Sequence, residues 1–141
     1  MARKNRIVVV VLCAAFLAAG YASYRGVLSR EAEKIIIYLY AIEDAKTVED
    51  FYKVEITNKD DVAKTIRYVT GIPSPGYKCG YQGKIAYYRE DGGVLLDMQF
   101  NTDCNTVVFV YDDKLYNRRI SGRGLRDLKA LLENVPPEKR L

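Results

Sequence analysis

The chain is predicted to be an α+β domain: an antiparallel sheet of about six strands, with two helices packed on one face. Three observations predict this fold. Strand-like runs occur in adjacent pairs, two helices have recognisable capping residues, and two cysteines are spaced as one hairpin would place them. The expected order is ββαββββα. Covering one sheet face with both helices is the economical way to bury their apolar sides.

The first two strands are expected at residues 34–42 and 51–56. The run from Lys34 to Ile42 is β-branched and aromatic, and its unbroken apolarity fits a central strand, although so short a run is also compatible with a helix. The run from Phe51 to Ile56 alternates between apolar and polar residues and is predicted to be its neighbour.

The first helix is expected to begin after the capping box Thr57-Asn58-Lys59-Asp60. Its apolar residues Val62, Ile66 and Val69 share one helical face. Gly71 is expected to end the helix, and the prolines that follow prevent its return.

The next two strands are expected to form a hairpin about Asp91-Gly92, between the runs 84–90 and 94–100. With that turn, the residue numbers of each cross-strand pair add up to 183. Ile85, Tyr87 and their partners then form one apolar face. The same register places Cys79 opposite Cys104 at a pair where side chains come closest. The sequence therefore predicts a Cys79–Cys104 disulfide.

A second hairpin is expected from residues 106–111 and 114–120 about Asp112-Asp113. Ser121-Gly122 then precedes the last helix, which Pro136 stops. The apolar stripe of that helix consists of Leu125, Leu128, Leu131, Leu132 and Val135.

The first 22 residues have the three regions of a Sec-type export signal. Three cations precede an apolar run over residues 7–19, and Gly20-Tyr21-Ala22 supplies small residues where a signal peptidase reads them. We expect cleavage after Ala22, because the run is shorter than the roughly 20 residues of a membrane-spanning helix. In the alternative, residues 7–24 remain as a membrane anchor with Tyr21 and Tyr24 at the interface. The remaining divisions are a tether over 23–33, one domain over 34–135 and a flexible tail over 136–141.

Export would place the protein in an oxidising compartment, periplasmic or extracellular, where paired cysteines form disulfides. Without residues 1–22 the 22 cations fall to 19 against 18 acids, so the net charge falls from +4 to +1. Nucleic-acid-binding domains carry a marked basic excess, so no nucleic-acid partner is expected. Contact with a membrane is expected only through residues 7–24, if they are retained.

The chain has no histidine, which removes the commonest general base and metal ligand. We expect no catalytic group, metal or cofactor. The sharpest site-like feature is a group of arginines and glycines around the start of the last helix, where exposed amides can hold a phosphate or carboxylate. This candidate anion site consists of Arg118, Arg119, Gly122, Arg123, Gly124 and Arg126.

Twelve tyrosines and no tryptophan are the most unusual feature of the composition. Tyrosine is enriched at protein interfaces, although it also favours strands because it fits them. We expect Tyr88, Leu95 and Tyr116 to line a sheet face that no helix covers. The sequence therefore predicts an exported, non-catalytic protein-binding module whose partner is another envelope or secreted protein. A receptor for a small anion is the alternative, and an enzyme that works without histidine is the third possibility.

Overall fold

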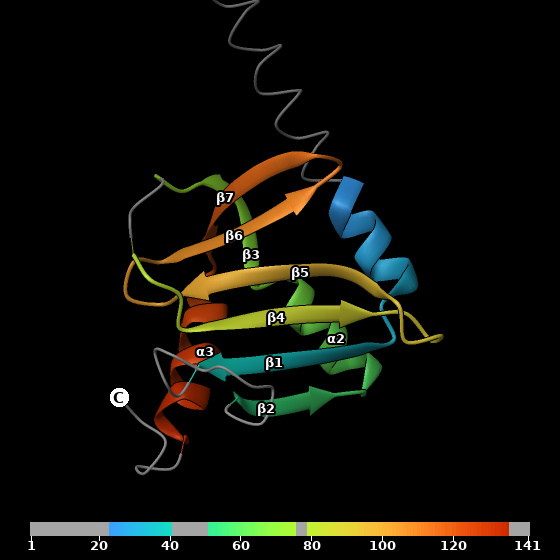
Figure 1. The fold of residues 1–141 in the computed structure, drawn as a ribbon, viewed down its shortest axis with the longest axis horizontal. Helices are drawn as coiled ribbons and strands as arrows, with labels where there is room; N and C mark the ends of the chain where they lie inside the picture. The colour runs from blue at the N-terminus through green and yellow to red at the C-terminus, as the bar shows by residue number, and fades with distance from the viewer. Residues whose placement is uncertain (1–22, 41–50, 76–78, 136–141) are drawn as a thin grey trace, which may run out of the picture.

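The computed structural model describes residues 23–40, 51–75 and 79–135, which form an α+β domain (Figure 1). The helices are α2 (Lys59–Ile66), α3 (Gly122–Glu133) and a helical segment over residues 23–31. Seven antiparallel strands make one sheet in the order β2-β1-β4-β5-β6-β7-β3. They are β1 (Lys34–Tyr40), β2 (Phe51–Ile56), β3 (Val69–Pro73), β4 (Gly83–Tyr88), β5 (Val94–Asn101), β6 (Thr106–Tyr111) and β7 (Lys114–Ile120).

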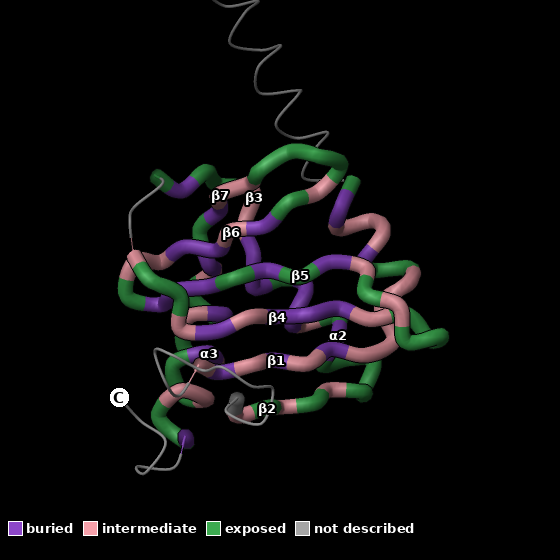
Figure 2. Tube along the Cα trace, viewed as in Figure 1, coloured by how far each residue is buried: buried purple, intermediate pink, exposed green. Residues whose placement is uncertain are grey.

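The core lies between one face of the sheet and the helices. Ile35, Ile37 and Leu39 of β1 are all fully buried, while the residues between them are only half-buried. Buried and less buried positions also alternate along β5 (Figure 2). This alternation is the pattern of a sheet that packs on one side only. The predicted α+β class with an antiparallel sheet is therefore confirmed, although the described residues contain three helices rather than two.

The sheet has seven strands rather than six, because β3 was expected to be the end of a helix. Helix α2 stops at Ile66, and Arg67 is its C-cap residue. Val69 then enters the core as a strand residue that pairs with Ile120. Pro73 is tolerated because β3 is an edge strand, which needs only one set of ladder hydrogen bonds.

The start of α2 also differs from the predicted capping box. The N-cap is Asn58, whose side-chain oxygen accepts hydrogen bonds from the backbone N–H groups of Asp60 and Asp61 at 3.0 and 3.3 Å. Asparagine is as good an N-cap as aspartate or serine and better than threonine, which accounts for the shift by one residue.

Residues 23–31 belong to the stretch 23–33 that was predicted to be a tether. They are helical, and Tyr24 and Leu28 are 0% and 2% exposed. The two side chains are four residues apart and therefore share one face of the helix. The Tyr24 ring meets the Phe109 ring edge-on, with centroids 4.9 Å apart. Tyr24 therefore belongs to the core of the domain, and it does not lie at a membrane interface.

The β4–β5 hairpin has the predicted pairing but a different turn. Ile85 pairs with Met98, and Tyr87 pairs with Leu96, as the sum of 183 requires. At the tip, however, the Gly92 N–H donates to the Arg89 carbonyl at 3.0 Å, and Gly92 has a φ of 84°. The loop is thus a type I turn followed by a glycine in the left-handed region. A bulge between Tyr87 and Tyr88 absorbs the extra residue and restores the predicted register.

The predicted Cys79–Cys104 disulfide is present, with the two Cα atoms 6.5 Å apart. The ladder itself ends at the pair Gly83–Phe100, so the bridge joins the loops beyond it rather than a cross-strand pair. Asn101 shapes one of those loops, because its side-chain oxygen accepts from the N–H groups of Asp103 and Cys104, both at 2.9 Å. Closing a loop of this size stabilises the fold by about 3 kcal/mol.

The predicted export signal and the C-terminal tail lie outside the described residues. Within the part of the chain that the structure describes, no helix is long and apolar enough to cross a membrane.

Candidate protein-binding face of the sheet

One face of the sheet is covered by no described helix. In Figure 1 helices α2 and α3 lie behind the strands, so the view looks onto this uncovered face. Its residues are those that alternate with the buried ones, so Ile36 and Tyr38 of β1 face away from the core. The two hairpins continue the same face across the sheet toward β7.

The first feature of the uncovered face is a cluster of tyrosines and lysines on β1, β2 and β4. Tyr38 lies between its cross-strand neighbours Lys53 and Lys84, whose Nζ atoms are 5.7 and 4.9 Å from the centre of its ring. The hydroxyls of Tyr38 and Tyr88 are hydrogen-bonded at 2.9 Å, and Lys34 lies over the Tyr88 ring at 5.5 Å. Cations over aromatic faces hold both partners in place. The cluster is therefore an ordered, positively charged surface.

Tyr88 stays protonated at physiological pH. Partial burial, together with the hydrogen bond to Tyr38 and the nearby Asp97 carboxylate, raises the pKa of Tyr88 to about 12. The cluster thus offers the neutral phenol of Tyr88 and the lysine side chains around it to a partner. Asp97 offsets one of the charges through a 3.8 Å ion pair with Lys84.

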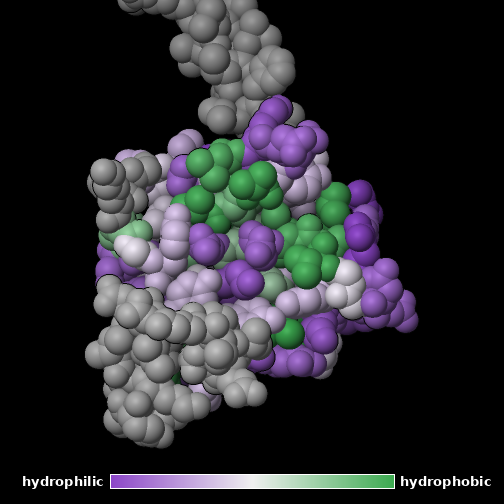
Figure 3. Space-filling model, in the orientation of Figure 1, coloured by the Kyte–Doolittle hydropathy of each residue, from purple (hydrophilic) through white to green (hydrophobic). Residues whose placement is uncertain are grey.

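The second feature is an apolar pair at the other side of the same face. Val110 of β6 and Leu115 of β7 are direct cross-strand partners, and they are 58% and 65% exposed. Figure 3 shows apolar surface gathered over the β6–β7 hairpin. Asp97 and Gln99 of β5 separate this pair from the tyrosine–lysine cluster. Val110 and Leu115 therefore form a small exposed apolar patch on this face.

Of the three residues predicted for this face, Tyr88 belongs to the tyrosine–lysine cluster. Leu95 is half-buried, is the extra residue of the bulge in the β4–β5 hairpin, and packs against the core. Tyr116 is a correction, because it lies on the helix-covered face. Its ring stacks on Phe109 with centroids 5.2 Å apart, and its partner in the ladder is the same buried phenylalanine.

Val110 and Leu115 are the residues that sequence reasoning missed. A signal for them was present, because the pairing about Asp112-Asp113 places 110 opposite 115 on the face opposite Phe109. Tyr38 and its flanking lysines could not be found in this way, since the pairing of β1 with β4 spans 40 or more residues and leaves no local pattern.

The predicted anion site is not gathered into one place. Arg118 is buried on the covered face, with its guanidinium 5.0 Å from the centre of the Tyr116 ring. Arg119 is exposed and, by strand alternation, points to the opposite side of the sheet. Arg123 forms a 3.8 Å ion pair with Asp127.

The remaining members of that site lie at the start of α3. Gly124 is buried, and a side chain there would come within 2.8 Å of Tyr68, so its role is close packing. Its N–H donates to the N-cap residue Ser121 at 3.1 Å. Gly122 and Arg126 are exposed. The helix start therefore has its own cap. Arg126 Nη1 lies 4.0 Å from the position of a Cβ on Gly122, whereas Arg118 and Arg119 point to opposite faces of the sheet.

Among the described residues, no three His, Cys, Asp or Glu side chains are grouped as metal ligands. Comparison with known proteins finds no match: no protein-family model, no curated protein and no solved structure corresponds to this chain. Any functional conclusion therefore depends on the surfaces described above.

Proposed function

We propose that this protein is a non-catalytic protein-binding module and that the uncovered sheet face is its docking surface. The observation that carries the proposal is that the exposed pair of Val110 and Leu115 lies on the same sheet face as an ordered tyrosine–lysine cluster. Burying a large aliphatic side chain contributes about 1.5–3 kcal/mol, so two such side chains supply a useful part of a specific affinity.

The face combines an exposed apolar pair with a polar, positively charged cluster, and protein interfaces contain both kinds of surface. Tyrosine gives contact area at a small cost in conformational entropy, because its ring has few rotatable bonds. Tyr38 and Tyr88 are already held by their mutual hydrogen bond, so little further ordering is needed on binding. The lysines around them favour a partner with acidic groups at its rim.

The partner is proposed to be another envelope or secreted protein. The Cys79–Cys104 disulfide is the structural support for a compartment outside the cytosol, since disulfides do not persist in reducing compartments. The apolar run after the first cations of the sequence supports export through the Sec pathway.

The proposal is tested by placing a photoactivated cross-linking residue at Leu115 in the full chain, expressed in its native cells. The same residue at Ile72 is the matched control, because Ile72 is also exposed and apolar, at 58%, but lies on the edge strand β3. A discrete cross-linked protein at 115 and none at 72 is the expected result. Equal cross-linking at both positions, or none at either, would contradict the proposal.

A second measurement uses charge to block the face. Leu115→Lys should weaken binding to the cross-linked partner at least tenfold, an estimate that corresponds to about 1.4 kcal/mol. Ile72→Lys should leave the affinity unchanged. Since both side chains are mostly in solvent, neither substitution should alter the thermal unfolding of the free protein.

A further inference from the structure

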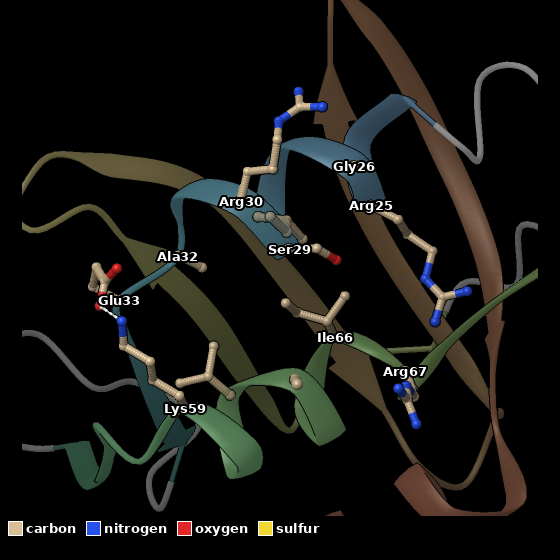
Figure 4. A pocket seen from close by; sticks show the side chains of 12 residues that line it. Arg25, Gly26, Ser29, Arg30, Ala32, Glu33, Lys59, Ile66 and Arg67 are labelled. Carbon is tan, nitrogen blue, oxygen red and sulfur yellow. Dashed lines mark ion pairs between the residues drawn. The ribbon is translucent and has the colours of Figure 1, made fainter.

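A groove separates the helical segment 23–31 from α2 on the covered side of the molecule (Figure 4). Its volume is about 500 Å³, which is in the range of small-molecule sites. Leu28 of the segment and Val62 and Ile66 of α2 form its floor, and all three are at most 5% exposed. Ala32 and Ala63 line it with short side chains, which leaves the groove open.

The rim of the groove is strongly basic. Arg25 and Arg30 come from the helical segment, and Lys59 and Arg67 come from the two ends of α2. Glu33 is the one acidic residue among the described lining residues, and it pairs with Lys59 at 3.5 Å. Four cations against one acid leave an excess of three positive charges around an aliphatic floor.

The charge is distributed unevenly along the groove. Figure 4 shows Lys59 and Glu33 at one end and the side chains of Arg25 and Arg67 at the other. Arg30 folds back over Gly26, with its Nη1 atom 3.9 Å from the position of a Cβ there. Within the described residues no acidic group pairs with Arg67. The Lys59–Glu33 ion pair thus occupies one end of the groove, and the guanidinium groups of Arg25 and Arg67 lie at the other end.

We infer that this groove binds an anionic membrane phospholipid, with an acyl chain over Leu28, Val62 and Ile66 and the phosphate at Arg25 and Arg67. Guanidinium groups bind phosphate through charge-assisted hydrogen bonds. The floor is aliphatic, and no aromatic side chain is among the described lining residues. This composition suits a hydrocarbon chain better than the aromatic anchors typical of protein partners.

The position of the groove in the chain supports a lipid rather than an acidic peptide. Arg25 follows the apolar run of residues 7–19 by only six residues, and the groove begins there. An apolar N-terminal run brings the start of the domain to a membrane, whether it is retained or later removed. The groove lies on the helix-covered side and leaves the proposed protein-binding face free, so the two inferences are independent.

The test is native mass spectrometry of the full chain, as recovered from its cells, in a non-ionic detergent. Lysophosphatidylglycerol is the anionic probe, and lysophosphatidylcholine with the same acyl chain is the zwitterionic one. We expect one bound lysophosphatidylglycerol and an affinity for lysophosphatidylcholine at least about tenfold lower. The double variant Arg25→Gln with Arg67→Gln should lose that preference for the anionic head.

Two controls separate the groove from general charge and from the apolar N-terminal run. Arg119→Gln with Arg126→Gln removes the same two charges elsewhere and should keep the preference. Ala63→Leu fills the groove and should weaken binding of both lipids without changing the fold, because Ala63 is exposed. Equal binding of the two lipids, or an equal loss in both double variants, would overturn the inference. So would inorganic phosphate or an acidic amphipathic peptide binding more tightly than lysophosphatidylglycerol.

Discussion

At the residue scale, the β6–β7 turn has an unusual backbone conformation. Asp112 and Asp113 have φ angles of 51° and 57°, so both central residues of the β6–β7 turn are in the left-handed region. This is a type I′ turn, whose twist matches that of the flanking strands. Aspartate tolerates this region better than most residues, but it still costs free energy that glycine would not.

Asp113→Gly should therefore stabilise the domain by about 0.5–1 kcal/mol, since relief of strain exceeds the extra freedom that glycine gains in the unfolded chain. Asp113→Ala should destabilise it, because alanine lacks the local hydrogen bonds of aspartate at a positive φ. Urea unfolding of both variants measures the two changes. The same sign for both substitutions would show that the backbone angle is not the cause.

Gly83 in strand β4 is required for a different reason, because there is no space for a side chain at this position. A Cβ on Gly83 would lie 2.4 Å from the Tyr38 carbonyl oxygen and 2.6 Å from the Phe100 ring. The predicted register, in which paired residue numbers sum to 183, also places Gly83 opposite Phe100, and the structure confirms this pair. The sequence did not reveal the contact with Tyr38, because that residue comes from a strand more than 40 positions away.

At the scale of elements, local sequence patterns predicted the hairpins well. They failed for elements whose secondary structure depends on tertiary contacts. The runs 106–111 and 114–120 became β6 and β7 with the predicted bounds, because alternation and turn residues lie within one short stretch. Strand β3 has only five residues and contains glycine and proline, so its propensity is poor. Pairing with β7 and burial of Val69 form it nonetheless.

The helical segment 23–31 was missed for a related reason. It is short and polar apart from a few residues, and isolated helices of this length are unstable in water. Its stability comes from the contacts of Tyr24 and Leu28 with the sheet. The same contacts pack this stretch against the sheet.

Tyr24→Ala should destabilise the domain by about 3–5 kcal/mol, the cost of removing a large buried aromatic side chain. Tyr24→Phe keeps the ring contacts with Phe109 and Tyr111, so most of that loss should be absent. Thermal unfolding followed by circular dichroism compares the three proteins. If Tyr24→Ala unfolds like the parent protein, residues 23–31 do not belong to the cooperative domain.

At the scale of the whole molecule, one seven-stranded sheet presents two different faces. Its covered face holds the core and the basic groove, and its uncovered face holds the apolar pair and the tyrosine–lysine cluster. The sequence predicted such a division, because helices were expected on one side only. The order of the strands decides which residues share the uncovered face. In this sheet β1 lies next to β4, a pairing that no local sequence pattern indicates.

The many tyrosines give the whole molecule a dependence on alkaline pH. Burial raises the pKa of Tyr87 well above its usual value, and burial with the hydrogen bond to Asp127 does the same to the pKa of Tyr68. For Tyr88 the pKa is raised to about 12. A tyrosine whose folded pKa is raised holds its proton more tightly when folded. Its contribution to stability is complete below the unfolded pKa of about 10 and is lost as pH rises above it.

The free energy of unfolding should therefore fall as the pH rises above about 10, where the unfolded chain releases tyrosine protons that the folded chain retains. Each retained proton contributes a slope of up to about 1.4 kcal/mol per pH unit. Tyr87→Phe removes one such proton, so the slope above pH 10 should become shallower in that variant. The variant also loses the 3.3 Å hydrogen bond from the Tyr87 hydroxyl to the Thr65 carbonyl, which is a modest loss of stability at neutral pH.

Urea unfolding at a series of pH values, with tyrosinate absorbance recorded in parallel, measures both effects. Ionisation of the buried tyrosines in the folded protein, without loss of stability, would show that water reaches the core beneath the helices.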